Sequence, residues 1–188
     1  MNKKLIVLSA PSGGGKTTVA KHLLSTFSNI KFSISATTRQ KRENEINGRD
    51  YYFLTKEEFQ EKINKNEFVE YEEIYGNYYG TLHSEINEAI KNNKILLFDV
   101  DVKGALSIKK AYPKEALLIF LMSPDFETLQ KRLRERQTET EEQFNKRIER
   151  VKMELDMKDK FDFVVINDKL EQTLKEVENI VRNNIFQS

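Results

Sequence analysis

The stretch "SAPSGGGKTT", Ser9 to Thr18, decides how the rest of the chain is interpreted. The apolar run Leu5–Leu8 lies directly before it and has the composition of a buried strand, while a helical pattern begins at Lys16. The order strand, Gly-x-x-x-x-Gly-Lys-Ser/Thr, helix is typical of a phosphate-binding P-loop, and the chain departs from it only at the first glycine, which is Ala10. We therefore predict such a loop rather than a glycine-rich turn that happens to precede a lysine. Its residues are Ala10, Pro11, Ser12, Gly13, Gly14, Gly15, Lys16, Thr17 and Thr18.

The residue types in this stretch suit a nucleoside triphosphate. Glycines let successive backbone N–H groups converge on phosphate oxygens in conformations that leave no room for a Cβ. Lys16 supplies a charge for the β- and γ-phosphates, and Thr17 a hydroxyl for Mg²⁺. A partner acid should end another core strand, as Asp99 does after "ILLF", so we predict that Asp99 holds Mg²⁺ through water. An acid in this place can equally cap a helix, since "DVKGAL" follows.

The remaining apolar runs indicate the fold class. Three of them have the length and flanks of central parallel strands: Ile95–Val100, Ala116–Met122 and Phe163–Ile166. Helical patterns cover about 103–111, 125–159 and 169–186. This alternation predicts an α/β fold, a P-loop core with a central parallel sheet flanked by helices on both faces.

Two segments differ from this core. The region from about 33 to 83 carries short aromatic and β-branched pieces, among them "KFSIS", "YYFL" and "NYYGT". They surround one helix near Thr55, where Thr55 and Glu58 have the spacing of a capping box, so we predict a small mixed or antiparallel inserted lobe. The segment at about 125–159 is strongly charged with few large apolar residues, and we predict a mobile helical lid that packing cannot hold tightly. The core then comprises about 1–32, 84–124 and 160–188 of a single domain.

Composition narrows the class of protein. The 188 residues fit one compact domain, and 31 basic against 30 acidic residues leave a net charge of +1, so no global field favours nucleic acid or a membrane. The absence of cysteine excludes disulfides, thiolate metal sites and a cysteine nucleophile. The first apolar run is only four residues long and no run approaches 18 residues, so we expect a soluble, cytoplasmic protein without a transmembrane helix. Composition does not decide between a monomer and a homo-oligomer.

The inserted lobe supplies the groups that would choose an acceptor. A P-loop alone does not distinguish between hydrolysing ATP, binding GTP and phosphorylating a second molecule. Two arginines and two tyrosine hydroxyls are donors that a phosphate monoester would need, and they are Arg39, Arg42, Tyr51 and Tyr79. The acceptors and donors that a purine edge would need are Glu70 and the hydroxyls of Ser35 and Thr81.

With these residues in place, the chain resembles the guanylate kinases. The matching motifs are "SAPSGGGKT", "SATTRQKR", "NGRDYYF", "FVEYEEIYGNYYGT", "FDVDVKGA", "KRLRERQTETEEQFNKR" and "VVIND", in the family's order from near Leu5 to at least Asp168. Bacterial members of the family also carry alanine at the first P-loop glycine. The chain departs from the family at Lys41 and Asn44, where Arg-x-Pro-Arg-x-Gly-Glu has Pro and Gly. These two departures bear on the loop that carries Arg42.

The resemblance implies a role for each candidate residue. Ser35, Glu70 and Thr81 would hold guanine, whose N1–H and exocyclic amine are adjacent donors that one carboxylate can accept together. The GMP phosphate would bind Arg39, Arg42, Tyr51 and Tyr79, and Asp101 would lie between the two nucleotides. In the lid, Arg132, Arg136 and Arg147 would neutralise the transferring phosphoryl group, while Asn167 would lie beside adenine. The implied reaction is Mg²⁺-dependent transfer of the ATP γ-phosphoryl group to GMP, and to dGMP, in purine nucleotide metabolism.

Several alternatives remain at this stage. A kinase of AMP or UMP would share the P-loop, and Glu70 is the residue that argues against it. A guanylate-kinase-like interaction module would keep the fold and bind phosphopeptides, but such modules typically have a degraded ATP loop, whereas Lys16 and Thr17 are present here. A P-loop GTPase or nucleic-acid motor would need switch or guanine-base motifs that we do not find in the sequence.

Overall fold

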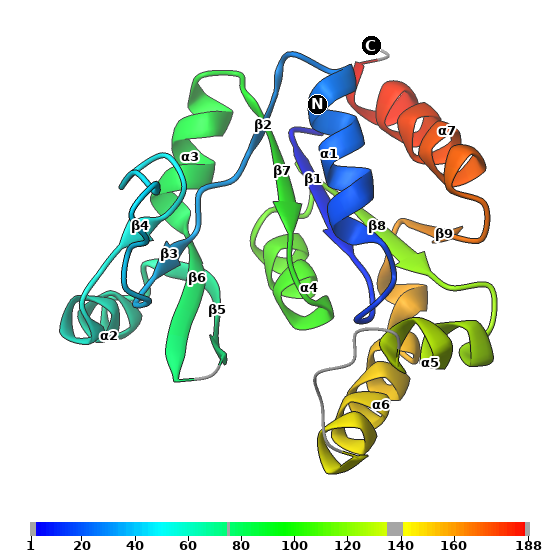
Figure 1. The fold of residues 1–188 in the computed structure, drawn as a ribbon. Helices are drawn as coiled ribbons and strands as arrows, with labels where there is room; N and C mark the ends of the chain where they lie inside the picture. The colour runs from blue at the N-terminus through cyan, green and yellow to red at the C-terminus, as the bar shows by residue number, and fades with distance from the viewer. Residues whose placement is uncertain (1–2, 75, 135–140, 187–188) are drawn as a thin grey trace.

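The computed structural model describes residues 3–74, 76–134 and 141–186. Over these residues the chain forms two separate β-sheets with helices around them (Figure 1). Among the helices described, none combines the length and the apolar character that a membrane span requires.

The larger sheet has five strands in the order β2-β7-β1-β8-β9, and every pairing is parallel. Its strands are β1 (Leu5–Ser9), β2 (Ile30–Phe32), β7 (Ile95–Asp99), β8 (Ala116–Met122) and β9 (Phe163–Ile166). Leu8 of β1 pairs with Asp99 of β7. The two central strands therefore end at the same edge, where ligands bind in open α/β sheets.

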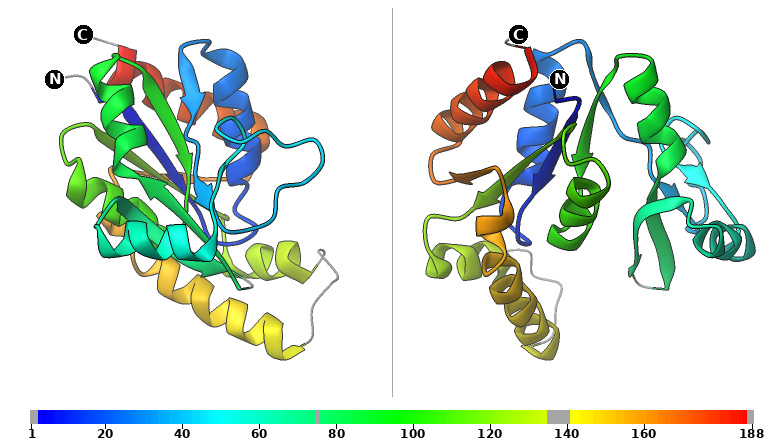
Figure 2. Two further views of the ribbon diagram at one scale, coloured as in Figure 1. Left: turned by 90° about the vertical axis from the view of Figure 1, so that its left-hand side faces the viewer. Right: turned by 180° about the vertical axis from the view of Figure 1, so that it is seen from behind.

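The side chains of β1 alternate between the two faces of the parallel sheet, so the apolar core around this sheet consists of two clusters, one on each face. Ile6 and Leu8 face one apolar cluster, in which α1 (Lys16–Thr26) and α7 (Leu170–Val181) cover the sheet. Leu5 and Val7 face the other cluster. There the sheet is covered by α3 (His83–Lys91) and α4 (Val102–Ala111), and Figure 2 shows the two layers from behind. The prediction of a parallel sheet with helices on both faces is confirmed.

The structure corrects two details of the core. We predict "KFSIS" as a piece of the inserted lobe, but Lys31 and Phe32, which fall inside the core boundary predicted near residue 32, belong to β2 at the edge of the parallel sheet. Both are exposed, so this edge strand lacks the continuous apolar run that marked the other four. The helix α3 was not predicted at all. It starts directly after a strand, and its N-cap, Leu82, makes no side-chain capping bond that could have signalled it.

The smaller sheet is mixed, as predicted, with the order β4-β3-β6-β5. Its strands are β3 (Ala36–Thr37), β4 (Tyr52–Phe53), β5 (Phe68–Ile74) and β6 (Asn77–Leu82). Phe59 of α2 (Lys56–Asn64) is fully buried and stacks on Phe68 and Tyr78, so Tyr78 packs against the helix of this lobe. The predicted capping box of α2 is also confirmed: Glu58 N–H donates to Thr55 Oγ1 (3.1 Å), and Thr55 N–H donates to the Glu58 carboxylate (2.7 Å).

A register shift in β5 changes the direction in which the Glu70 side chain points. Phe68 pairs with Leu82, but Glu70 pairs with Thr81, so the two strands are out of step between Phe68 and Glu70. Gly80 lies beside this irregularity, and a Cβ there would come within 2.9 Å of the Phe68 ring and 2.8 Å of the Glu70 carbonyl oxygen. Such irregularities commonly re-aim side chains next to active sites. Here the shift brings the Glu70 side chain opposite Thr81.

The helices α5 (Phe126–Arg134) and α6 (Glu141–Leu155) pack on each other below the carboxyl edge of the parallel sheet (Figure 1). Their shared apolar cluster was not anticipated from the charged composition, because its members are spread over two helices. It consists of Leu129, Leu133, Phe144, Ile148 and Val151. The helix pair thus has a small core of its own.

Candidate active site

The phosphate loop has the backbone that its glycines predict. Gly15 has φ +90°, a left-handed conformation that favours glycine, and a Cβ there would collide with the side-chain amide of Asn167. Gly14 is required for a different reason: a Cβ on it would lie 2.6 Å from that of Ala10. The methyl group of Ala10 thus occupies space beside Gly14, and the loop closes without a glycine at its first position.

Lys16 and Asp99 meet at the carboxyl edge of the sheet. The Lys16 ammonium donates to the Ala10 carbonyl oxygen at 3.1 Å and lies 3.7 Å from Asp99 Oδ1. Burial raises the pKa of Asp99 above its ordinary value, and the charge of Lys16 opposes that shift. The cation and the carboxylate therefore share the mouth of the phosphate loop.

Asn167, which follows β9, and Arg132 of α5 support the loop at the carboxyl edge of the sheet. The buried amide of Asn167 donates to the Gly14 carbonyl oxygen at 3.0 Å. The Arg132 guanidinium donates to the Asn167 carbonyl oxygen at 3.1 Å and to the Ser123 hydroxyl at 3.3 Å. Arg132 is therefore tied beside the P-loop in this structure.

A second group of acids lies where β5 and β6 approach α4. The Thr81 hydroxyl donates to Glu70 Oε1 at 2.6 Å. Burial raises the pKa of Glu70 to about 7; the Thr81 hydrogen bond opposes this, and the charges of Asp101 and Glu72 add to it. Asp101 is the N-cap of α4 and accepts from Gly104 N–H at 2.8 Å. The residue that caps the helix after β7 is therefore Asp101 and not Asp99.

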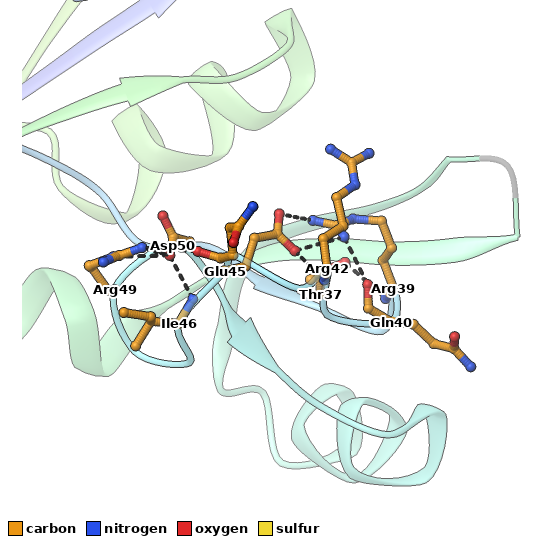
Figure 3. Close-up of polar contacts among 9 residues, drawn as sticks. Thr37, Arg39, Gln40, Arg42, Glu45, Ile46, Arg49 and Asp50 are labelled. Atoms are coloured by element: carbon orange, nitrogen blue, oxygen red, sulfur yellow. Dashed lines mark hydrogen bonds and ion pairs between the residues drawn. The ribbon is translucent and has the colours of Figure 1, made fainter.

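Arg39 lies in the loop before β4, and Figure 3 shows how it is held. Its guanidinium donates to both oxygens of Glu45, at 2.7 and 3.0 Å, and lies 5.3 Å from the centre of the Tyr51 ring. The Arg39 hydrogen bond is the main cause that lowers the pKa of Glu45 to about 2. Arg42 N–H also donates to Glu45 at 2.7 Å, while the Arg42 side chain extends away from that carboxylate (Figure 3). Glu45 thus ties the two arginines into one loop despite Lys41 and Asn44.

One cavity of about 560 Å³ connects Lys16 and Asp99 with Glu70 and Asp101. The predicted residues Arg39, Arg42, Arg132 and Asn167 are not among those that line it. It is lined by ten of the residues predicted from sequence, which come from the P-loop, the small sheet, the end of β7 and α6. They are Ala10, Ser12, Lys16, Ser35, Tyr51, Glu70, Tyr79, Asp99, Asp101 and Arg147.

Other predicted residues lie around this cavity. Thr81 is fully buried behind Glu70, and Thr17 and Thr18 are exposed at the start of α1. Arg136, predicted to act with Arg132 and Arg147 on the transferring phosphoryl group, lies outside the described residues.

Sequence reasoning missed five charged residues at or beside the cavity. They are Glu45, Asp50, Glu72, Arg150 and Glu154. The spacing of Arg150 three residues after Arg147 was a usable signal, because residues three apart share a side of a helix. Glu45 ends the motif that contains Arg39 and Arg42, so it too could have been named.

The fold and the site define the class of P-loop kinases that carry a second, smaller sheet for the acceptor. The guanylate kinase family model matches residues 2–184. The chain belongs to the guanylate kinase family, and its function is ATP-dependent phosphorylation of GMP.

Curated relatives and a solved structure agree with this assignment. A guanylate kinase of Chlorobaculum tepidum is 50% identical over 93% of this chain and 89% of its own length. One from Porphyromonas gingivalis is 47% identical over 95% of this chain and 96% of its own. The crystal structure of guanylate kinase from Anaplasma phagocytophilum matches with a TM-score of 0.74 and 29% identity, covering 100% of this chain and 88% of that one.

Proposed function

We propose that this protein transfers the ATP γ-phosphoryl group to GMP, and to dGMP, in a Mg²⁺-dependent step with the residue roles given below. The observation that carries the proposal is the shared cavity, in which Lys16 of the phosphate loop and Glu70 of the small sheet line one space. No covalent intermediate is needed, because the GMP phosphate oxygen is already ionised and is the nucleophile. Catalysis then consists mainly of alignment and charge neutralisation.

The ATP half of the proposal rests on the P-loop. Its backbone N–H groups between Ala10 and Thr18, all but Pro11 having one, cradle the phosphates, and α1 directs its N-terminus at them. Lys16 exchanges its contact with the Ala10 carbonyl oxygen for the β- and γ-phosphates. Asn167 holds Gly14 from behind and borders the adenine site.

The residues present fit a magnesium ion that arrives with ATP. Mg²⁺ is bound in such sites by one or two protein oxygens together with phosphates and waters, rather than by a protein cage. Asp99 and the exposed Thr17 are oxygen donors of this kind, and the described residues contain no cluster of three or more His, Cys, Asp or Glu side chains suited to a metal. When bound, the ion would neutralise charge on the β- and γ-phosphates. Thr17 would hold it directly and Asp99 through water.

The acceptor half rests on the small sheet. Glu70 in its ionised form accepts guanine N1–H and the exocyclic amine, while Thr81 orients it through their hydrogen bond and Ser35 borders the same cavity. Asp101 lines the same cavity and would lie between the two nucleotides. The GMP phosphate binds the two arginines and two tyrosines named above, with Arg39 already fixed by Glu45. A bidentate contact of this type discriminates between bases by about 1–3 kcal/mol.

The helix pair α5 and α6 serves as the lid. Arg147 lines the cavity already, and Arg132 and Arg136 complete the set that neutralises the transferring phosphoryl group on closure. Closure would also exclude water and so suppress hydrolysis of ATP. In this proposal the acceptor lobe is about 33–83, the lid about 125–159, and the remainder the core. We further propose a cytoplasmic protein of purine nucleotide metabolism that binds neither nucleic acid nor a membrane.

A coupled assay of ADP formation tests the proposal. With ATP and Mg²⁺, turnover is expected with GMP and dGMP and to be far slower with AMP and UMP. Removal of the metal with EDTA should abolish turnover, and adding Mg²⁺ back should restore it. Full turnover in EDTA would contradict the metal role, and a preference for AMP would contradict the assignment of Glu70 to guanine.

A further inference from the structure

Arg150 joins three parts of the molecule through ion pairs. Its guanidinium lies 3.0 Å from Asp101 Oδ2 at the start of α4 and 3.4 Å from Glu72 Oε2 in β5. Its Nε donates to Glu154 at 3.0 Å, one turn further along α6. A lid residue thus contacts carboxylates of the core, the acceptor lobe and the lid itself.

These contacts lie in one wall of the substrate cavity, which we call the acidic wall: Glu70, Glu72, Asp101 and Glu154. A second cavity, of about 590 Å³, lies behind it and is lined by the same four acids and by Arg150. Glu70 and Asp101 are close neighbours, since Glu70 Oε2 and Asp101 Oδ1 both lie 3.2 Å from the point where a Cβ on Gly104 would be. The charges of Asp101 and Glu72 oppose the ionisation of Glu70, and the acids of this wall also repel the phosphate of GMP.

We propose that Arg150 is a positioning residue for GMP binding, which neutralises Asp101 and Glu72 and so keeps the neighbouring Glu70 in its carboxylate form. The inference rests on the proposed role of Glu70 as the guanine ligand. Arg150 does not touch guanine in this scheme and acts through the acidic wall.

The pH dependence follows from the groups that surround Glu70. These are Glu72 on its own strand, Thr81 on β6, Asp101 and Lys103 on α4, and Arg150 and Glu154 on α6. Glu70 titrates near neutral pH, because burial raises its pKa to about 7. Removing a nearby cation raises this pKa further, so that less Glu70 is ionised in slightly acidic solution. The defect should therefore be largest at low pH and should shrink as pH rises.

The experiment compares Arg150→Gln with Arg150→Lys, and uses Lys131→Gln as a matched loss of charge at an exposed lid position. The KM values for GMP and for ATP are measured from pH 6 to 8.5. For Arg150→Gln we expect KM for GMP to rise about threefold at pH 6 and to change by less than about 1.2-fold at pH 8.5, as follows from an upward shift of about half a pKa unit in Glu70. Arg150→Lys and Lys131→Gln should stay within about 1.5-fold of the wild type. KM for ATP should be unchanged in all three.

A second variant tests the same wall from the acceptor lobe. Glu72→Gln removes one carboxylate, so it should shift the pH dependence of KM for GMP downward and offset part of the Arg150→Gln defect in the double variant. The Glu72→Gln single variant tests the inference even if Arg150→Gln does not fold normally.

Three results would overturn the inference. The first is a ratio of KM for GMP between Arg150→Gln and the wild type that does not change with pH. The second is a KM for GMP in Arg150→Lys as high as in Arg150→Gln. The third is a KM for ATP that rises in Arg150→Gln as much as KM for GMP does. Failure of the proposed function is recognised separately in Glu70→Gln. Normal GMP binding by that variant would refute Glu70 as the guanine ligand, whatever Arg150 does.

Discussion

The carboxylate of Glu45 accepts two hydrogen bonds from the guanidinium of Arg39, of 2.7 and 3.0 Å, and a third from the backbone N–H of Arg42. One edge of the Arg39 fork is therefore occupied by a fixed carboxylate, while its face lies over Tyr51 and Phe53. A preorganised arginine loses less side-chain entropy when a phosphate binds to the remaining N–H groups.

The first prediction follows from this contact. Glu45→Gln keeps one acceptor but loses the charge-assisted pair, so KM for GMP should rise about tenfold, with kcat within about threefold of the wild type. Steady-state kinetics with varied GMP measure this, and Glu43→Gln, an exposed acid in the same loop, is the control. Tighter GMP binding by the variant would mean that Glu45 competes with the phosphate instead of positioning Arg39.

The second prediction concerns pH. Because burial raises the pKa of Glu70 to about 7, this acid is neutral below that pH and ionised above it. Guanine needs the ionised form, so KM for GMP should fall as pH rises from 6 to 8. In Glu70→Gln this part of the pH dependence should vanish, leaving only that of the GMP phosphate, whereas Glu73→Gln, exposed on the same strand, should retain it. An unchanged profile in Glu70→Gln would refute the assignment.

The third prediction concerns Gly104 in α4. A Cβ there would lie 3.2 Å from both Glu70 Oε2 and Asp101 Oδ1, so Gly104→Ala must displace the two carboxylates by a few tenths of an ångström. We expect KM for GMP to rise about threefold or more and KM for ATP to stay constant. The folded state should not be weakened, because alanine is favoured over glycine in a helix by about 1 kcal/mol. Kinetics and thermal melting together measure this, with Ser107→Ala in the same helix as control.

The fourth prediction concerns Lys16. Lys16→Ala should lower kcat at least about a hundredfold, because it removes the cation that neutralises the transferring phosphoryl group. GMP affinity, measured by calorimetry without ATP, should remain within about threefold of the wild type. Lys21→Ala, exposed on the same helix, serves as control. Near-normal turnover of Lys16→Ala would refute the proposed mechanism.

Local signals explain which parts of the fold could be predicted. The strands β1, β7, β8 and β9 are continuous apolar runs in the sequence, although β9 is an edge strand with only Val165 buried rather than the central strand predicted. The capping box of Thr55 and Glu58 is a short-range pattern. By contrast, β2 is three residues long with only Ile30 buried, and its pairing with β7 joins segments about 65 residues apart. Such an edge strand forms because it pairs with β7, so the sequence around β2 alone does not predict it.

The candidate site, like the fold, could be predicted from the sequence only in part. The sequence alone determined the chemistry that is available: a loop for phosphates around Lys16, an acid at the end of β7, and arginines, tyrosines and Glu70 for an acceptor. Only the tertiary structure decided which of these groups act on one another. The irregularity beside Gly80 turns Glu70 onto Thr81, and the packing of α6 near α4 and β5 brings Arg150 to Asp101 and Glu72. The physical reason is that residue type fixes what a side chain can donate, accept or ionise, whereas its pKa and its partners depend on burial and on charges that other elements bring close.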